Sequence, residues 1–243
     1  MQGASQRRRA ALPSVVALVL LVLLIAAPAV GAAPRVGTHV QELALLQQTH
    51  TVWSAPDKYS KMLGVVRAQR PLTDEQTALP VVGHAAGSDG VRWLQVLLPG
   101  RPNGHTGWIV ARDTTHATTP WRILIRTAAR LVTIYRGDVA VRTFPAVVGK
   151  PSTPTPHGTF FVEEAIQLRS GDVGAPFALA LSARSTVFQE FDGGPGQVAL
   201  HGLTNVGGVL GTAVSHGCVR LANDAMRWLV VRVGPGVPVT ITS

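Results

Sequence analysis

Short apolar runs broken by turn residues extend through most of this 243-residue chain and restrict the folds open to it. The chain contains 25 glycines and 17 prolines, two residue types that interrupt helices and strands and favour turns. After the first 34 residues, only 40–48 and 223–233 show helical periodicity. The pattern predicts a mainly β protein with one or two short helices.

Residues 1–32 have the pattern of a targeting segment. Three arginines at 7–9 precede an uncharged stretch that is wholly apolar from 15 to 27, and Val30-Gly31-Ala32 offers small residues to a signal peptidase. We expect cleavage after Ala32 and export to the cell envelope. The uncharged stretch is also close to the ~20 residues that span a bilayer, so an uncleaved leader that tethers the chain to the membrane is the alternative.

The chain is basic, with a formal net charge of +9, of which three units belong to the leader. A basic exported protein suits acidic partners such as wall polymers or anionic lipids. The remaining Lys and Arg residues are scattered, and no basic run is interleaved with aromatic residues. That distribution argues against a nucleic-acid partner.

Residues 34–115 and 120–243 form two predicted domains, separated by the Thr- and Ala-rich stretch 116–120. Residues 65–66, 81–82 and 93–98 read as strands of a small barrel in the first. The second is predicted to contain strands at 122–126, 131–135, 139–144, 159–162 and 237–241 and a helix at 223–233, with Asn223 as its cap.

Three segments of the first domain resemble bacterial SH3-like domains. They are Thr51–Pro56, which is similar to the first strand, and Gly90–Val96 followed by Gly107-Trp108-Ile109, which are similar to the last strands. The resemblance implies a small SH3-like β-barrel. Such domains bind cell-wall polymers or pack against a catalytic partner.

The single cysteine, Cys218, excludes an intramolecular disulfide and a four-cysteine zinc site. A lone cysteine is often only a small buried apolar residue. This one follows Gly217 and precedes the predicted helix 223–233, where backbone amides can stabilise a thiolate and an oxyanion. Its position therefore also fits a nucleophile.

A thiol nucleophile needs a base, and all eight histidines precede Cys218. That order excludes papain-like hydrolases, in which the histidine follows the cysteine. The candidates are His157, His201 and His216. The same three with Cys218 could supply four zinc ligands, but none of the usual zinc-ligand spacings is present, so we expect neither a metal nor another cofactor.

The second domain resembles the L,D-transpeptidase catalytic domain of the YkuD family over 121–243. The signature is His201-Gly202 followed by Ser215-His216-Gly217-Cys218. Val147–Lys150 and Pro154–Phe160 match further motifs of the family in order. The resemblance implies a YkuD-type β-sandwich. Some members carry Asn two residues after the cysteine, where this chain has Arg220.

The resemblance also implies roles for individual residues. Cys218 is the expected nucleophile and His201 the base, oriented by the carbonyl of Gly202. Amides near Gly217 and Cys218 are the expected oxyanion donors. Ser215, His216, Gly217 and Arg220 are the expected substrate-binding residues, with Arg220 either meeting a substrate carboxylate or forming a structural salt bridge.

The implied reaction forms 3→3 cross-links between peptidoglycan stem peptides, one the acyl donor and one the acceptor, through a thioester on Cys218. Water as the acceptor would make the protein an L,D-carboxypeptidase. A non-catalytic wall-binding protein is the alternative of a different class. Residues 163–196, between the proline-rich turn and His201, are placed to form a lid or specificity loop.

Overall fold

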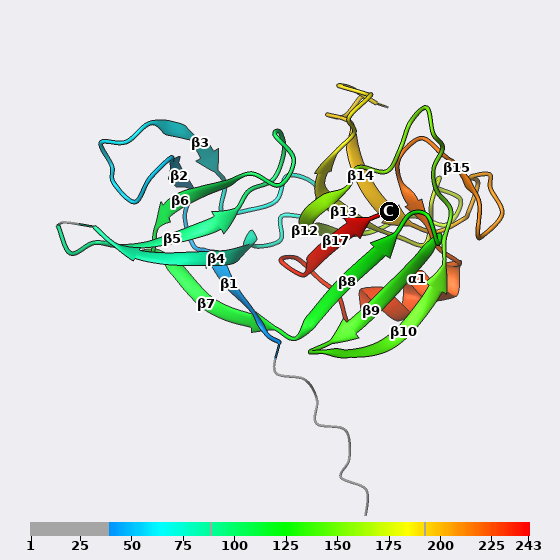
Figure 1. Ribbon diagram of the computed structural model, residues 1–243, viewed down its shortest axis with the longest axis horizontal. Coiled ribbons are helices and arrows are strands. Elements are labelled where there is room, and N and C mark those ends of the chain that lie inside the picture. Colours follow the sequence, from blue (N-terminus) through cyan, green and yellow to red (C-terminus); the bar gives the residue numbers. More distant parts are fainter. Residues whose placement is uncertain (1–38, 88, 192) are drawn as a thin grey trace, which may run out of the picture. The chain divides into compact units, whose positions relative to one another are not determined.

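The computed structural model describes residues 39–87, 89–191 and 193–243 (Figure 1). The predicted leader, residues 1–32, lies outside them. Among the described residues, no helix has the length and apolar character needed to cross a membrane.

The first half forms one seven-stranded antiparallel sheet in the order β3-β2-β6-β5-β4-β1-β7. Its strands are β1 (Gln41–Leu46), β2 (His50–Trp53), β3 (Met62–Val66), β4 (Ala78–Ala86), β5 (Arg92–Leu97), β6 (Thr106–Val110) and β7 (Thr114–Thr119). The helical periodicity of 40–48 was misleading, because β1 is hydrogen-bonded on both sides, to β4 and β7. A helix of this length has little stability of its own.

The predicted strands at 65–66, 81–82 and 93–98 coincide with β3, β4 and β5. The predicted boundary 116–120 is mostly strand β7, and Pro120 alone separates it from the next strand. The sheet is open, since β3 and β7 form its two edges. The likeness to SH3-like domains stays a prediction.

The second half forms a mixed eight-stranded sheet in the order β10-β9-β8-β17-β12-β13-β14-β16, and β11 pairs separately with β15. Its strands are β8 (Trp121–Arg126), β9 (Leu131–Arg136), β10 (Val139–Pro145), β11 (Val148–Gly149), β12 (Gly158–Gln167), β13 (Phe177–Arg184), β14 (Gln197–His201), β15 (Ala213–Ser215), β16 (Val219–Arg220) and β17 (Pro238–Thr242). All five predicted strands are present, and the mainly β character is confirmed.

Helix α1 (Asn223–Val230) is shorter than the predicted 223–233 and buries Ala225, Met226 and Leu229. Asn223 does not cap it, because the N-cap position is Ala222 and no side chain makes a capping bond. The Asn223 side chain instead accepts a hydrogen bond from Leu203 N–H at 2.8 Å. The predicted cap therefore ties the helix to the chain that follows His201.

Strand β12 contributes to both hydrophobic cores. Phe160 belongs to the core of the second half, whereas Phe161, on the opposite face of the strand, packs among residues of the first half. Figure 1 shows β12 and β13 next to the amino-terminal sheet.

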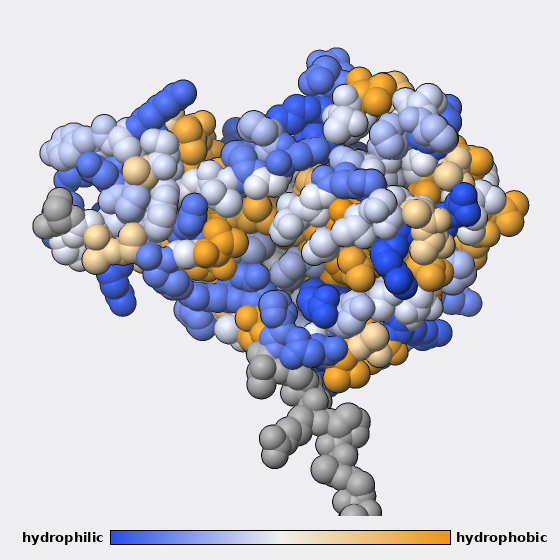
Figure 2. All heavy atoms as spheres, in the orientation of Figure 1, coloured by the Kyte–Doolittle hydropathy of each residue, from blue (hydrophilic) through white to orange (hydrophobic). Residues whose placement is uncertain are grey.

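In Figure 2, the apolar residues on the visible face form separate small groups among polar ones.

A buried ionic cluster also joins the two halves. This junction cluster consists of Arg70 from the first half and Glu163, Glu164 and Arg184 from the second. Glu163 is paired with Arg70 and, at 2.9 Å, with Arg184. Glu164 accepts three hydrogen bonds of 3.1 Å from the backbone of Leu72 and from Thr73. Charges buried in this way must be paired, so the junction has a fixed geometry.

Candidate active site

Strands β14 and β16 place the key residues on one face of the sheet. They pair in parallel, with Leu200 opposite Val219 and His201 opposite Arg220. Side chains alternate along a strand, so Leu200 and Val219 point into the core, where both are fully buried. His201, Cys218 and Arg220 therefore share the opposite face, although 17 to 19 residues separate the histidine from the other two in sequence.

The His201 ring is oriented by its own neighbour. Its Nδ1 lies 2.8 Å from the carbonyl oxygen of Gly202. A carbonyl only accepts, so Nδ1 carries the hydrogen and Nε2 is left as the basic nitrogen. Burial lowers the pKa of His201 below its usual range; the bond to Gly202 raises it and the charge of Arg220 lowers it. At neutral pH the ring is a neutral base.

Two glycines allow the backbone to approach His201 closely. A Cβ on Gly202 would lie 2.1 Å from the Ala175 oxygen, and one on Gly174 would lie 2.6 Å from His201 Nδ1. The Gly202 N–H donates to the Gly174 carbonyl at 2.7 Å. Sequence reasoning missed Gly174, whose only signal was its residue type inside the segment 163–196.

Ser215 shapes the turn that carries Cys218. Its hydroxyl donates to the Cys218 carbonyl at 2.6 Å and accepts from the Gly217 N–H at 3.1 Å. The Ser215 side chain is fully buried and binds the backbone of the turn, and its predicted contact with the substrate stays a prediction. Gly217 is buried too, at a φ of +123° that favours glycine. Its amide is engaged, which leaves the Cys218 N–H of the expected pair to meet an oxyanion.

Two threonines of the proline-rich turn form hydrogen bonds with the backbone of the turn that carries Cys218. Thr153 and Thr155 donate their hydroxyl hydrogens to the carbonyls of Ser215 and Gly217, at 3.1 and 2.9 Å. The Thr155 oxygen also accepts from the Gly149 N–H at 2.9 Å. The motifs around 147–150 and 154–160 thus hold the turn in place. The sequence analysis recognised these motifs but predicted no role for Thr155, or for Thr153, which lies between them.

Cys218 is a half-buried free thiol. Burial raises its pKa, while a backbone hydrogen bond from Ala199 and the charge of Arg220 lower it. Arg220 donates to the carbonyl of Gly207, and its Nε is buried without a partner among the described residues. Among the described residues no carboxylate pairs with Arg220, and its role as a substrate contact or a structural salt bridge stays a prediction. The shifts favour the neutral forms of the thiol and the imidazole, beside a cation that no described carboxylate pairs with.

A family model of the L,D-transpeptidase catalytic domain, YkuD, matches residues 120–241, half of the chain. The chain belongs to this family.

Relatives from two genera match this half. A Bacillus licheniformis protein named for the L,D-transpeptidase YkuD is 33% identical over 128 residues, which are 51% of this chain and 67% of the relative. L,D-transpeptidase 1 of Mycobacterium tuberculosis is 31% identical over 126 residues, 47% of either chain. The match thus spans about half the length of the mycobacterial relative.

Among solved structures, an L,D-transpeptidase from Mycobacterium smegmatis aligns with 68% of this chain and 99% of its own, at 20% identity and a TM-score of 0.39. A similarity at that level supports no further conclusion. The YkuD half of the chain is defined by the family model and by the geometry of its own residues.

The other two candidate histidines, His157 and His216, are both exposed. His157 is exposed and its Nε2 is 2.9 Å from the Thr127 hydroxyl, so it belongs to the surface. His216 is exposed as well, and its ring stacks on Phe191 with centroids 5.9 Å apart. In the described part of the chain, no group of three or more His, Cys, Asp or Glu side chains is arranged to hold a metal ion.

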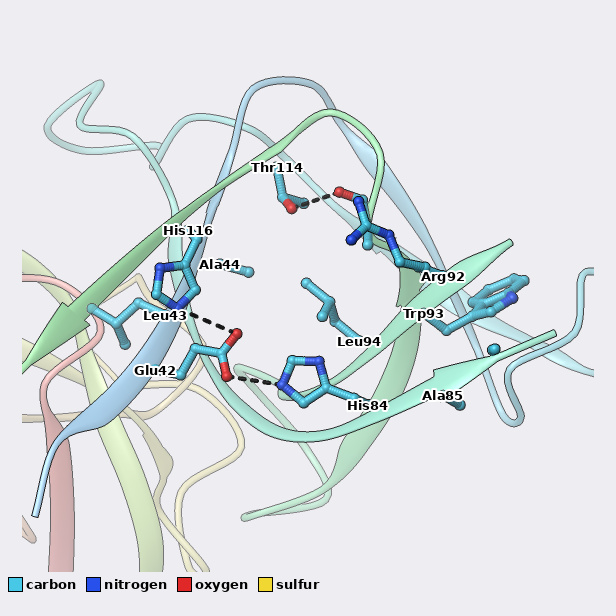
Figure 3. Close-up of a pocket in the computed structure, with 12 residues that line it drawn as sticks. Glu42, Leu43, Ala44, His84, Ala85, Arg92, Trp93, Leu94, Thr114 and His116 are labelled. Atoms are coloured by element: carbon cyan, nitrogen blue, oxygen red, sulfur yellow. Dashed lines mark hydrogen bonds and ion pairs between the residues drawn. The ribbon is translucent and has the colours of Figure 1, made fainter. Parts of the chain in front are cut away.

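A hollow of about 520 Å³ lies in the amino-terminal half (Figure 3). Glu42 of β1 is 2.8 Å from His84 Nε2 of β4 and 3.6 Å from His116 Nε2 of β7. Figure 3 shows these three side chains at one side of the hollow, with Arg92 at the other and Leu94 between them. The hollow combines a carboxylate, imidazoles and a guanidinium around apolar side chains.

Proposed function

We propose that this chain is a cysteine-dependent L,D-transpeptidase that forms 3→3 cross-links between peptidoglycan stem peptides. The observation that carries the proposal is the shared face of β14 and β16. It presents a thiol, a neutral imidazole whose Nε2 is the basic nitrogen, and a guanidinium with no carboxylate partner among the described residues. A base and a thiol brought together in this way are the two parts that thioester chemistry needs.

In the first step, His201 Nε2 takes the proton of the Cys218 thiol, and the sulfur attacks the carbonyl carbon between the third stem residue and the terminal D-alanine. The Cys218 N–H donates to the developing oxyanion. The tetrahedral intermediate then collapses: the C–N bond breaks, His201 returns the proton to the leaving D-alanine amine, and a thioester remains. Because Nδ1 is held by Gly202, the ring needs no acidic third residue.

In the second step, the side-chain amine of an acceptor stem attacks the thioester carbonyl. His201 takes a proton from that amine, the C–S bond breaks, and the thiolate is reprotonated, which restores the resting pair. Arg220 suits a carboxylate of the stem peptide, since a guanidinium fork matches a carboxylate and its buried Nε has no partner among the described residues. His216 lies two residues before Cys218, and its ring contacts Phe188 and Phe191.

The amino-terminal half, proposed to be SH3-like, would bind cell-wall polymers. The hollow around Glu42, His84, His116 and Arg92 supports this, because it offers charges of both signs to a peptide that carries amines and carboxylates. The leader pattern at 1–32 supports export to the cell envelope, with either release or a membrane tether.

Product analysis tests the proposal. The full chain is incubated with a stem tetrapeptide, with and without an acceptor stem, and the products are separated and weighed by mass spectrometry. We expect released D-alanine and a 3→3 dimer only when the acceptor is supplied. D-Alanine release without dimer would assign the carboxypeptidase reaction instead, and no release from folded protein would leave wall binding as the function.

A further inference from the structure

The connection between β13 and β14 borders the active site. It carries Phe188 and Phe191, whose ring centroids lie 5.4 Å apart. Both rings also contact His216, with centroids 6.2 Å away for Phe188 and 5.9 Å away for Phe191. Because His216 is two residues before Cys218, this aromatic group lies next to the turn that carries the thiol. Phe191 is 50% exposed and offers an apolar face to an incoming peptide.

The Arg101 side chain of the amino-terminal half binds both ends of this connection. The Arg101 guanidinium donates through Nη1 to the Pro195 carbonyl at 3.0 Å. Through Nη2 it donates to the carbonyls of Ser185 and Phe188, at 2.9 and 2.8 Å. These three carbonyls come from both ends of the connection. A planar fork with several donors is suited to join them, and a single ammonium is not.

Asn103 fixes the start of the same connection. Its side-chain amide donates to the Arg184 carbonyl at 2.7 Å, and its oxygen accepts from the Arg184 N–H at 2.8 Å. Gly196 completes the fit, since its φ is +64° and a Cβ there would lie 2.3 Å from the Phe188 oxygen. The connection is thus shaped to receive the loop that contains Arg101 and Asn103.

Bonds within the connection are local by comparison. The Ser185 hydroxyl oxygen accepts from the N–H groups of Val187 and Phe188, at 3.2 and 3.0 Å. Phe191 and Gly194 exchange two backbone bonds across a tight turn. The Ser185 N–H also donates to the Gly196 carbonyl at 2.7 Å, which closes the base of the connection. The Arg101 bond to the Phe188 carbonyl adds a contact from the amino-terminal half directly to the segment that carries the phenylalanines.

We propose that Arg101 is a positioning residue for the transpeptidase reaction. It holds the segment with Phe188 and Phe191 against His216, and this aromatic wall places the peptide donor in front of Cys218. The inference rests on the proposed function for its substrate. It makes the amino-terminal half part of the active site, in addition to any polymer that this half binds.

The test compares the full chain with its Arg101→Ala and Phe191→Ala variants. We expect Arg101→Ala to lower kcat/KM for the tetrapeptide donor roughly tenfold, because small misplacements of a substrate are costly. Alkylation of Cys218 by iodoacetamide should stay at the wild-type rate, since the thiol and its base are untouched. If Arg101 acts through the aromatic group, the double variant should lose no more than Phe191→Ala alone.

Thr73→Ala is the matched control. It removes another contact between the same two halves, to Glu164 in the junction cluster, and it should leave donor kinetics unchanged. An equal loss in Thr73→Ala would show that any loosening of the junction has this effect and would overturn the assignment. A wild-type kcat/KM in folded Arg101→Ala would overturn it as well. If Arg101→Ala does not fold, donor kcat/KM is measured for Arg101→Lys instead. We expect a smaller loss of kcat/KM in that variant, and a wild-type value would overturn the assignment.

Amide hydrogen exchange separates this inference from the proposed function. Val187 and Phe188 N–H should exchange faster in Arg101→Ala than in the wild type, whether or not the protein cross-links stems. Faster exchange with a wild type that makes no thioester would refute the proposed reaction and keep the positioning contact. Unchanged exchange with an active wild type would refute the positioning contact alone.

Discussion

Two groups of buried polar side chains in this protein are built on opposite principles. In the junction cluster, Glu163 is paired with Arg70 and Arg184, and it also accepts from Gln197 at 3.2 Å. In the active site, Arg220 is placed beside Cys218 and His201 with no described carboxylate to balance it. The first group compensates its charges and fixes geometry, whereas the second leaves one cation available.

The pKa values follow this difference. Burial lowers the pKa of Arg184 to about 10, so it stays charged at neutral pH beside Glu163. Burial lowers the pKa of His201 and raises that of Cys218, so both active-site partners are pushed towards their neutral forms. The junction cluster therefore keeps permanent charges, whereas the proposed catalytic pair is held in its neutral form, as proton transfer between thiol and imidazole would need.

His201→Ala is the largest expected change in activity. Loss of a general base lowers rates about 10²- to 10⁴-fold, so thioester formation from a tetrapeptide should fall by that amount. Stopped-flow mass spectrometry of the adduct measures it, with circular dichroism to show that the variant is folded. If His201→Ala acylates normally and His216→Ala does not, the base has been assigned to the wrong histidine.

Glu163→Gln should have the largest effect on stability. It leaves the buried Arg70 and Arg184 without their carboxylate, and breaking such a pair costs about 3–5 kcal/mol of the free energy of unfolding. Urea unfolding measures the loss. The matched control is Asp224→Asn, which breaks an exposed pair with Arg227 and should cause no measurable change. Equal midpoints for the two variants would contradict the role of the junction cluster.

Ser215→Ala should have a smaller effect on stability. It removes a donor to the Cys218 carbonyl and an acceptor for the Gly217 N–H at a fully buried site, which costs about 1–3 kcal/mol. Thermal unfolding gives the change in stability, and donor kcat/KM shows whether the turn has shifted. If Ser215 met the substrate directly, kcat/KM would fall at unchanged stability.

The pH profile should show the smallest displacement. Because burial lowers the pKa of His201, the base stays deprotonated to a lower pH, and the acid limb of kcat/KM should lie below about 6.5. Arg220→Gln removes a charge that lowers the pKa of both His201 and Cys218, so it should move both limbs to higher pH. An acid limb above pH 7 in the wild type would contradict a buried, neutral imidazole.

Much of the site could be predicted from the sequence, because its signature residues are close together along the chain. The family resemblance carried by His201-Gly202 and the four residues ending in Cys218 implied an imidazole oriented by the Gly202 carbonyl. The pairing of β14 with β16 was not predicted. The supporting residues could not be predicted, since Thr155, Gly174 and Asn223 meet the site only through long-range pairing. The residue type of Asn223 was misleading, because asparagine is a common helix cap. Here its side chain makes no capping bond and instead accepts a hydrogen bond from the Leu203 N–H.

For the fold, too, local patterns could be predicted from the sequence and long-range contacts could not. Local alternation and turn residues predicted eight of the strands, including β5, β8 and β17. Strand β1 was ambiguous, since its helical periodicity is overridden by two neighbours that lie far along the chain. The hydrogen bonds from Arg101 to the β13–β14 connection could not be predicted from the sequence. An arginine between prolines and glycines resembles an ordinary loop residue.

The most direct test is to locate the acyl group. The full chain is mixed with a stem tetrapeptide, quenched in acid, digested and analysed by mass spectrometry, with Cys218→Ala as the control. The account predicts a stem-peptide adduct, lacking the terminal D-alanine, on the peptide that contains Cys218, and none in the variant. An active protein whose adduct lies on another residue, or whose Cys218→Ala variant still cross-links stems, would contradict it.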